Sequence, residues 1–564
     1  MDRLKEGAIQ PARRAWRAMW RTHREFILLL VLFVAFRGMA VLLVRPGGYI
    51  TTLSDFTFYR LLASYASQGF YPAVHYWMEY QPIFPWLAVG IYRLSLWFPN
   101  WGAPGFWFNL WLGLFFLLAE TANLILLYLI AGTLYRRPVA LRVAWIYGFL
   151  FAPLLIMLGW FDGFALTFLL LALYLTLRQR HRAGGIVAGL GFLVKLLPLM
   201  VVPVAFWREP TWKRRAVLLL VTLATIVVVA LPFALLNPDL FALSWTINLK
   251  RASWETVWAL LEGFYGYGLA GGGNRFDPAE AGALQHASTL PWGLITAGFG
   301  LLYLTLWLAA RDKVRDARRA AAFTGLTMNL VTLYLKGYSP QFLVWLLPFV
   351  ILLLPGLRGA VYALLLSAVN LVESPLYFTL LPDQTWLLAA AVLARTGLLI
   401  LLAVEYGLMA LRRPIPSRWS RRLCLAASLT LLAVAGIAAP AAYDAFYRNR
   451  LAVSPQRPLI ETLTAEAAPG DWVVIGGDEP AGAQGVYDAV YPFLRRRFHV
   501  ASVQTDWWFP DWQPRLQAAA QSAPGELWLY APADSPLHAW LADRYPRLAA
   551  HEFDGWLLTA WDTE

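Results

Sequence analysis

The chain alternates between long apolar stretches and short basic clusters, and this pattern excludes an ordinary soluble fold. A helix needs about 20 apolar residues to cross the hydrocarbon of a bilayer, and it must satisfy all its backbone polar groups internally. Hydrophobic residues make up 59% of the 564 positions and charged residues only 14%, as in polytopic membrane proteins. We expect spanning helices at residues 26–44, 105–131, 140–158, 163–178, 214–235, 290–309, 321–336, 341–355, 357–374, 385–411 and 421–440.

The net charge of +13 carries information about topology. Because Arg and Lys fall in clusters between apolar stretches, we do not expect nucleic-acid binding. Residues 1–25 are basic and show no small-residue cleavage site, so we expect a cytoplasmic N-terminus followed by an uncleaved anchor. The single cysteine, Cys424, excludes a disulfide within the chain.

Residues 184–207 are long enough for one span, but they carry Lys195 in the middle and Pro198 just after it. Basic clusters mark the cytoplasmic side. A single crossing here would separate the basic clusters onto two sides, whereas two half-helices that enter and leave on one side keep all of them inside. We therefore expect a broken hairpin with Lys195 near its outer apex, and about thirteen membrane helices in total. The clusters are at 136–137, 178–182, 208–215, 311–319 and 412–422.

This topology predicts a multi-pass plasma-membrane protein whose transmembrane domain, 26–440, has outer loops at 45–104 and 237–289. Residues 82–98 are interrupted by two prolines and an arginine, so we expect an interfacial helix there. In the second loop we expect an aromatic amphipathic helix carrying Trp254, Trp258 and Phe264, followed by glycines. A lid over a lipid substrate and a passive connector are both open interpretations of this loop.

From about residue 449 the apolar runs shorten, and the composition becomes that of an aqueous domain. Four apolar segments are typical of strands and three other segments are typical of helices, which predicts an extracytoplasmic α/β domain over 449–564. The sequence VVIGGDEPAG lacks the full glycine spacing of a nucleotide-binding turn, so a tight turn is favoured. The expected strands are 472–477, 498–503, 526–532 and 555–561, and the expected helices are 456–467, 511–522 and 534–544.

The first outer loop carries the main candidate for catalysis, Asp55. Tyr59 is four residues further on and therefore shares a helical face with Asp55, while Glu79 and Tyr80 follow in the same loop. A carboxylate in a partly dry pocket can accept a proton from a hydroxyl group, since desolvation raises its pKa toward the working pH. The alternative is that Asp55 caps a helix, although Ser54 could do so.

Further polar residues are expected at the same outer face. Asp162 is either a second pocket carboxylate or a helix start. A lipid phosphate leaving group requires nearby cations, and their alternative role is snorkelling to headgroups. The candidate cations are Lys195, Lys336 and Arg251, with Lys250 the weakest, and Tyr338 and Gln341 complete the expected pocket.

Two arginines inside predicted spans, Arg37 and Arg395, are expected to pair with buried carboxylates. His75 and Glu79 could share a metal with Asp55, but two ligands on one short stretch are a weak pattern. We expect no cofactor, and a divalent metal is not favoured. The sequence has no Walker loop and no cysteine cluster. Because a cytosolic nucleotide-sugar site is also missing, any sugar donor is expected to be lipid-linked.

Five segments together resemble the GT-C superfamily of polyprenyl-phosphate-sugar-dependent glycosyltransferases, particularly its bacterial mannosyltransferase-like branch. The resemblance covers roughly residues 26–350. It implies an active site at the outer face, Asp55 as general base, inversion at the sugar carbon and a polyprenyl-phosphate leaving group. Many relatives have two acidic residues where this chain has Ser54 beside Asp55, which lowers the expectation of a metal. The segments are SDFTFY (54–59), GFYPAVHYWMEYQPIFPW (69–86), GWFDGFALTFLLLALYL (159–175), AGLGFLVKLLPLMVVPV (188–204) and YSPQFLVWLLPF (338–349).

The favoured interpretation is thus an integral membrane hexosyltransferase, with mannose or another hexose as the sugar and a glycan, lipid or protein as the acceptor. A secondary transporter or lipid flippase, with its site at the broken helix around Lys195, is the main alternative. It would predict symmetry-related halves with matching broken helices, and only one such segment is found. A scaffold whose outer domain recruits partners is the third possibility.

Overall fold

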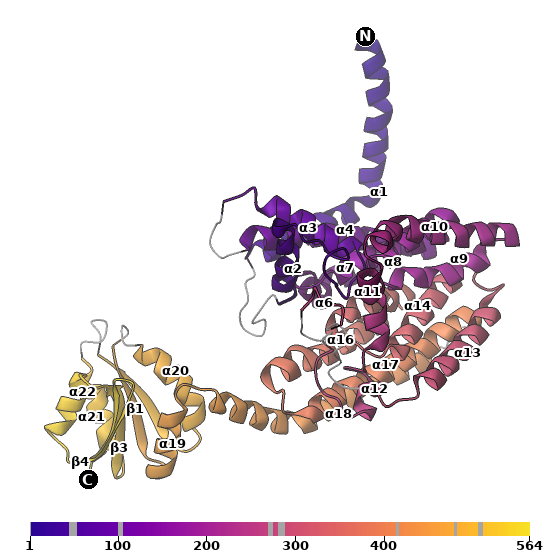
Figure 1. The fold of residues 1–564 in the computed structure, drawn as a ribbon. Helices are drawn as coiled ribbons and strands as arrows, with labels where there is room; N and C mark the ends of the chain where they lie inside the picture. Colours follow the sequence, from indigo (N-terminus) through magenta and orange to yellow (C-terminus); the bar gives the residue numbers. More distant parts are fainter. Residues whose placement is uncertain are drawn as a thin grey trace. The chain divides into compact units, whose positions relative to one another are not determined.

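The computed structural model describes residues 2–43, 54–99, 105–268, 274–279, 288–412, 417–478, 482–505 and 511–564. The chain divides into two compact units, Met1–Val434 and Ala435–Glu564. The first unit is helical, and the second contains a five-stranded sheet with its own helices (Figure 1). The expected class, a polytopic helical protein with a small C-terminal α/β domain, is confirmed.

The first part of the helical unit contains both long and short helices. Asn237 and Thr256 cap α11 and α12 by accepting hydrogen bonds from backbone N–H groups. The helices are α1 (Asp2–Leu43), α2 (Ser54–Ser64), α3 (Ile83–Ser95), α4 (Phe106–Leu134), α5 (Arg137–Phe149), α6 (Phe151–Met157), α7 (Asp162–Leu177), α8 (His181–Phe192), α9 (Val202–Arg208), α10 (Trp212–Leu236), α11 (Pro238–Lys250) and α12 (Val257–Leu261).

The second part of the unit packs closely around α14 and α15. Ala320, Ala321, Ala322 and Gly325 of α14 are buried, and small residues of this kind let helix backbones approach closely in a membrane. The helices are α13 (Trp292–Ala310), α14 (Ala317–Tyr334), α15 (Leu343–Leu353), α16 (Leu357–Leu371), α17 (Thr385–Leu411) and α18 (Ser417–Ala452). The segment Val372–Leu380 follows α16 and is kinked at Ser374, whose backbone is extended.

Within the described residues, seven helices are long and apolar enough to cross a membrane, or eight if α5 and α6, bent by 54°, form one span. Several of the other expected spans are shorter helices. α7 has 16 residues, and α15 has 11, all of them buried. A helix surrounded by protein need not match the bilayer thickness, because its ends are not exposed to lipid.

The broken hairpin predicted at 184–207 is confirmed. α8 and α9 are separated by residues 193–196 and a 3-10 turn, Leu197–Val201. Arg208, at the end of α9, donates a hydrogen bond of 3.5 Å to the carbonyl of Leu177, close to where α8 begins. Burial and the nearby Arg208 guanidinium lower the pKa of His181, the first residue of α8, to about 4. The two arms therefore return to the same side, and Lys195 lies at the break.

The expected interfacial helix is α3. Its first backbone N–H, that of Ile83, donates to the carbonyl of Leu193 at 3.2 Å. This bond joins the first outer loop to the break in the hairpin, which places both at one face of the unit. In Figure 1, α2, α3 and α7 lie next to one another, and buried residues of α2 and α3 share a hydrophobic cluster with Phe161 and Ala165 at the start of α7.

The prediction of one amphipathic helix carrying Trp254, Trp258 and Phe264 is wrong for Trp254 and Phe264, whereas Trp258 is helical in α12. Only the five residues of α12 are helical there, and Trp254 lies in extended chain paired with Gly337. The Trp254 N–H donates to the Lys336 carbonyl at 3.2 Å, and the Tyr338 N–H donates to the Trp254 carbonyl at 3.1 Å. These long-range bonds replace local helical ones. The glycines at 271–273 lie outside the described residues.

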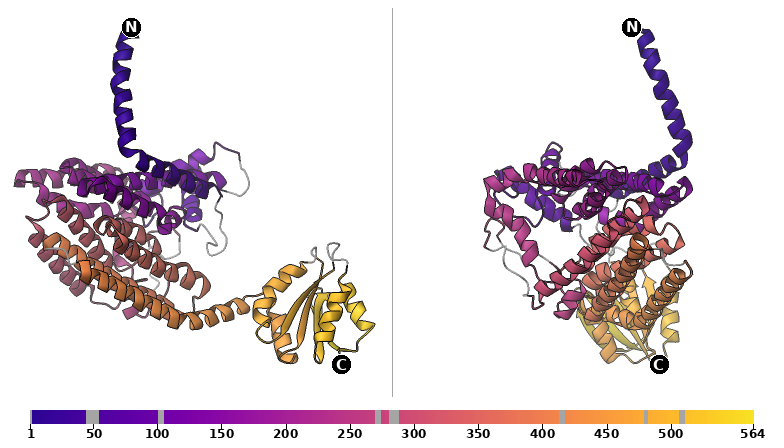
Figure 2. Two further views of the ribbon diagram at one scale, coloured as in Figure 1. Left: turned by 180° about the vertical axis from the view of Figure 1, so that it is seen from behind. Right: turned by 90° about the vertical axis from the view of Figure 1, so that its right-hand side faces the viewer.

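The C-terminal sheet has the strand order β2-β1-β3-β5-β4, with β1 parallel to β2 and β3, and β5 antiparallel to β3 and β4. Helices cover both faces: α19 and α20 pack on one and α21 and α22 on the other (Figure 2). The elements are α19 (Arg457–Glu466), β1 (Trp472–Gly477), α20 (Ala483–Leu494), β2 (His499–Gln504), α21 (Gln513–Ser522), β3 (Glu526–Pro532), α22 (Pro536–Ala542), β4 (Arg547–Phe553) and β5 (Trp556–Asp562).

Two of these elements are not predicted from the sequence. β4 is an edge strand without a fully buried residue, so it lacks the apolar alternation of a half-buried strand. α20 contains Gly485 and Pro492, which are signals against a helix interior. The turn after Gly477 continues into residues outside the described part of the chain.

Candidate active site

α2 carries the principal candidate, Asp55, in its first turn. The hydroxyl of Tyr59, one turn further on, donates to Asp55 Oδ2 at 3.1 Å. Tyr59 is itself buried, with its ring centroid 4.8 Å from that of Phe84 and 6.0 Å from that of Phe161. The face shared by Asp55 and Tyr59 therefore looks into an aromatic layer formed by α2, α3 and the start of α7.

The environment of Asp55 favours its neutral form. Burial raises the pKa of the carboxyl to about 6, and the negative charges of Asp162 and Glu79 act in the same direction. The Tyr59 hydrogen bond and the positive charge of Lys195 oppose this shift. A carboxylate whose pKa lies this close to neutrality suits proton abstraction.

Asp162, the first residue of α7, and Lys195, at the hairpin break, form an ion pair. Lys195 Nζ lies 2.7 Å from Asp162 Oδ1, and the carboxylate side chain is only 1% exposed. The ammonium also lies 5.0 Å from the ring centroid of Phe161 and 4.6 Å from those of Phe342 and Trp345. Lys195 is thus held in an aromatic cage beside a carboxylate and does not extend to lipid headgroups.

A buried polar network supports the first turn of α7. Asn123 Nδ2 donates to the Gly163 carbonyl at 2.9 Å and to Glu120 Oε1 at 3.1 Å. Glu120 Oε2 accepts from the Tyr147 hydroxyl at 2.8 Å, and Arg37 lies within electrostatic range of Glu120. Arg37 instead donates to the Gly148 carbonyl at 3.2 Å and influences Glu120 only through its charge, so the expected direct pairing with a buried carboxylate is not found among the described residues. The Asn123–Glu120–Tyr147 network fixes the backbone next to Asp162.

Arg395, in contrast, has a buried carboxylate partner, as expected. Its Nη1 pairs with Glu373 Oε2, and its Nη2 donates to the backbone carbonyl of Glu255. The guanidinium also lies over the ring of Tyr338, 3.6 Å from its centroid. Arg395 therefore anchors the extended chain around Glu255 to α17.

Glu79 is paired with Arg275, a residue that the sequence analysis missed. Arg275 Nη1 lies 2.6 Å from Glu79 Oε2, and its guanidinium lies 4.2 Å from the ring centroid of Trp77. The Trp77 N–H also donates to the Arg275 carbonyl at 3.0 Å. Arg275 is the one Arg or Lys between Arg251 and Thr289, and that isolation is the only sequence signal for it.

Arg251 and Lys336 have different surroundings. Arg251 stacks on Trp254, with Cζ 3.9 Å from the ring centroid, and lies within electrostatic range of Glu79. Lys336 Nζ donates to the carbonyls of Leu249 at 2.8 Å and Arg251 at 3.2 Å. Lys336 therefore clamps the chain that carries Arg251.

The remaining expected pocket residues lie on two sides of this region. Tyr80 is near Phe161, with ring centroids 4.9 Å apart, and burial raises the pKa of its hydroxyl well above the usual range. Gln341 is in the 3-10 turn Pro340–Phe342, beside the ring that contacts Lys195. Tyr338 is buried, and its hydroxyl donates to Asn370 Oδ1 at 3.4 Å.

The structure thus places the predicted residues in two adjoining groups. Hydrogen bonds, ring contacts and electrostatic interactions join Asp55, Tyr59, Tyr80, Asp162 and Lys195. The second group lies on the neighbouring extended chain and the first loop. It comprises Glu79, Arg251 and Arg275, the last of which the sequence did not predict. Lys336 and Tyr338 hold that extended chain in place through hydrogen bonds to the backbone carbonyls of Leu249, Arg251 and Trp254.

A metal site of three or more His, Cys, Asp or Glu side chains does not occur within the part of the chain that the structure describes. His75 Nδ1 accepts a hydrogen bond of 2.9 Å from the Tyr71 N–H. The expectation that a metal is not required stays a prediction.

No protein-family model and no curated protein sequence matches the chain. Among solved structures, ArnT from Cupriavidus metallidurans is similar at 14% identity and a TM-score of 0.38, over 96% of this chain and 98% of that one. An oligosaccharyltransferase from Archaeoglobus fulgidus in its apo form is similar at 13% identity and a TM-score of 0.35, over 91% of this chain and 70% of that one. The archaeal oligosaccharyltransferase AglB, solved with an inhibitory peptide and a dolichol-phosphate, is similar at 13% identity and a TM-score of 0.31, over 96% of this chain and 74% of that one. With TM-scores this low, the function must be argued from the site itself.

Proposed function

We propose that the chain is a GT-C-type membrane glycosyltransferase that moves mannose or another hexose from a polyprenyl-phosphate donor to an acceptor hydroxyl at the outer face of the plasma membrane. One observation supports this most strongly. Asp55, with a pKa near neutrality, lies within electrostatic range of the Asp162–Lys195 pair at the hairpin break. A proton acceptor and a cation from distant parts of the chain thus occupy one partly buried region.

In the proposed reaction Asp55 acts as the general base. The acceptor oxygen forms a bond to the anomeric carbon from one side while the bond from that carbon to the phosphate oxygen breaks on the other. The electron pair of the broken bond leaves with the polyprenyl phosphate, and the hydroxyl proton passes to Asp55. Tyr59 donates to Oδ2 of Asp55, which orients the carboxylate and leaves Oδ1 to accept the proton. The sugar carbon is inverted.

The cations stabilise the leaving phosphate. Preorganised positive groups are effective where negative charge grows, because they need not reorganise during the reaction. Lys195 is oriented by Asp162, while Arg251 and Arg275 flank Glu79. We assign Lys195 and Arg251 to the donor phosphate, and Lys336 to holding Arg251 in place. The acceptor is a glycan, lipid or protein.

The decisive experiment is the Asp55→Asn variant in proteoliposomes with radiolabelled polyprenyl-phosphate hexoses and a panel of acceptors. We expect transfer to fall by about 10²–10⁴-fold, because the amide cannot accept the proton. The matched control is Asp277→Asn, whose carboxylate makes a local bond to the Ala279 N–H. Wild-type turnover in Asp55→Asn would overturn the assignment. Label that accumulates inside vesicles with its phosphate bond intact would instead identify a transporter.

A further inference from the structure

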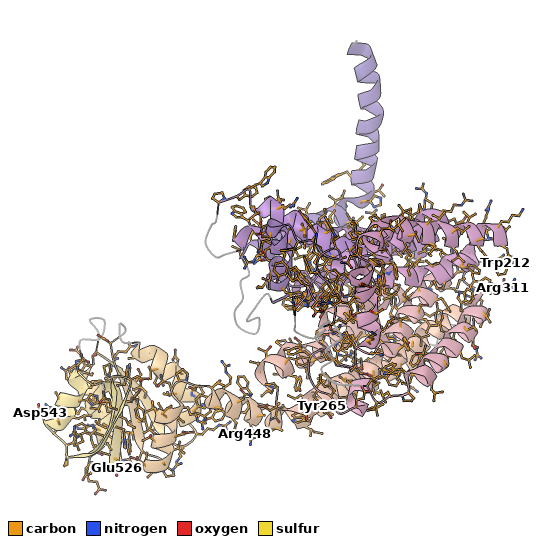
Figure 3. The ribbon with its side chains drawn as sticks, in the orientation of Figure 1. Trp212, Tyr265, Arg311, Arg448, Glu526 and Asp543 are labelled. Atoms are coloured by element: carbon orange, nitrogen blue, oxygen red, sulfur yellow. The ribbon has the colours of Figure 1, made fainter. Side chains whose placement is uncertain are left out.

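The end of α18 and the end of α20, with the two residues that follow α20, together form a basic and aromatic surface, which we call the collar. It lies entirely within the unit Ala435–Glu564. Figure 3 marks Arg448 on this last part of α18. The collar consists of Tyr443, Tyr447, Arg448, Arg450, Tyr491, Arg495 and Arg496.

Direct contacts fix the height of the collar along α18. The Tyr447 hydroxyl donates to the Phe493 carbonyl at 2.9 Å, and the two rings lie 4.7 Å apart. The Arg496 guanidinium lies 5.2 Å from the ring centroid of Tyr443 and 4.9 Å from that of Tyr447. Arg496 is therefore held level with Tyr443 and Tyr447, although it is distant in sequence.

From the sequence, we expect that level to lie at the membrane surface. The apolar part of α18 ends at Pro440, and Tyr443 follows about 4.5 Å further along the helix axis at 1.5 Å per residue. Tyrosines are enriched at the headgroup level of membranes, and arginines extend to headgroups from the same depth. The contacts with Tyr443 and Tyr447 bring Arg496 to this depth as well.

The charge of the collar is strongly positive. Arg448, Arg450, Arg495 and Arg496 are all exposed. The nearby carboxylate of Asp444 is 3.9 Å from Arg496 Nη1, and both side chains are more than half exposed, at 62% and 51%. At that distance and exposure one carboxylate does not offset four guanidinium groups, so the excess positive charge faces outward.

We propose that the collar binds the phosphate groups of anionic phospholipids in the outer leaflet and so holds the C-terminal domain against the bilayer. Guanidinium groups bind phosphate oxygens through paired hydrogen bonds, and each basic residue near an anionic surface adds to the attraction. The ligand is a lipid surface and not a soluble phosphate, because α18 delivers the collar to the headgroup layer. This surface is independent of the glycosyl-transfer site.

The test uses the full-length protein in nanodiscs of phosphatidylcholine, with or without phosphatidylglycerol, and measures hydrogen–deuterium exchange. We expect phosphatidylglycerol to slow exchange at residues 491–498 in the wild type. The double variant Arg495→Gln/Arg496→Gln should reduce this protection by roughly 30-fold, the factor expected for two arginines near an anionic surface. The control Arg544→Gln/Arg547→Gln removes the same charge from elsewhere in the domain and should keep the protection.

The exchange of β1 and β3 reports folding and should be the same in all three proteins. Added salt should weaken the protection if the lipid charge is responsible. Equal exchange in the two lipid compositions, or full protection in the Arg495→Gln/Arg496→Gln variant, would overturn the proposal. Loss of protection in the control variant as well would also overturn it, because a general charge effect would then suffice.

Discussion

Lys195 and Asp162 form a 2.7 Å ion pair that links the hairpin break to the first residue of α7. The lysine is partly accessible, with 18% of its side chain exposed, whereas the aspartate is almost fully enclosed. An enclosed carboxylate next to a partly accessible ammonium can orient that cation toward a bound anion. The pair therefore combines a structural role with the proposed catalytic one, and the two can be separated by mutation.

The variant Lys195→Met should lower the free energy of unfolding by about 3–5 kcal/mol, because it leaves the Asp162 carboxylate buried without its partner. The double variant Asp162→Asn/Lys195→Met should recover most of this loss and still fail to transfer sugar. Thermal unfolding in detergent and transfer assays would measure both effects. If the double variant regained transfer, Lys195 would have only a structural role.

The pH dependence of transfer should report the ionisation of Asp55. Its pKa of about 6 is raised by burial and by neighbouring carboxylates, so the base is protonated and inactive below that pH. We expect kcat/KM to rise about tenfold per pH unit up to roughly pH 6 and to level off above it.

Two neighbours of Asp55 should move this profile in opposite directions. Asp162→Asn removes a negative charge and should shift it to lower pH, whereas Tyr59→Phe removes the hydrogen bond to Asp55 Oδ2 and should shift it to higher pH. Steady-state kinetics from pH 5 to pH 8 would measure both shifts. A profile that is flat over this range in the wild type is incompatible with Asp55 as the base.

Gly163 should be intolerant of substitution. A Cβ at this position would lie 2.5 Å from Glu120 Oε1, and hydrogen bonds from Tyr147 and Asn123 prevent Glu120 from moving aside freely. Gly163→Ala should cost about 1–3 kcal/mol of stability and reduce kcat by displacing Asp162. Gly159→Ala is the control, because a Cβ there has nothing within 4 Å. Equal behaviour of the two variants would contradict a positioning role for the network.

Variants of Lys336 can distinguish two roles for this residue. It either clamps the chain that carries Arg251 or binds the donor phosphate directly. Lys336→Gln removes the charge, but its side-chain amide can still donate to the carbonyls of Leu249 and Arg251. Lys336→Leu removes both the charge and the hydrogen-bond donor. If Lys336 acts as a clamp, the glutamine variant should retain transfer within a few-fold, and the leucine variant should lose it and show faster hydrogen exchange at residues 249–256. An equally severe loss in both variants would assign the charge of Lys336 to the donor phosphate.

The sequence by itself determined the features that depend on local composition. Apolar length located the seven described helices that are long enough to cross a membrane. The distribution of Arg and Lys predicted the hairpin that the contact between Arg208 and Leu177 supports. Short apolar runs located four of the five C-terminal strands. The spacing of Asp55 and Tyr59 placed both on one face of a helix, and their hydrogen bond agrees with this.

Only the tertiary structure decided which distant groups meet. No local pattern pairs Glu79 with Arg275, because the two residues are 196 positions apart. They meet because the second loop, which carries Arg275, folds onto the first loop, which carries Glu79. The same holds for Trp254, whose extended conformation depends on backbone bonds to residues 336–338. Hydrophobic periodicity reports which face of a segment is buried, whereas a partner across the fold is chosen by shape, hydrogen bonding and charge that no single segment contains.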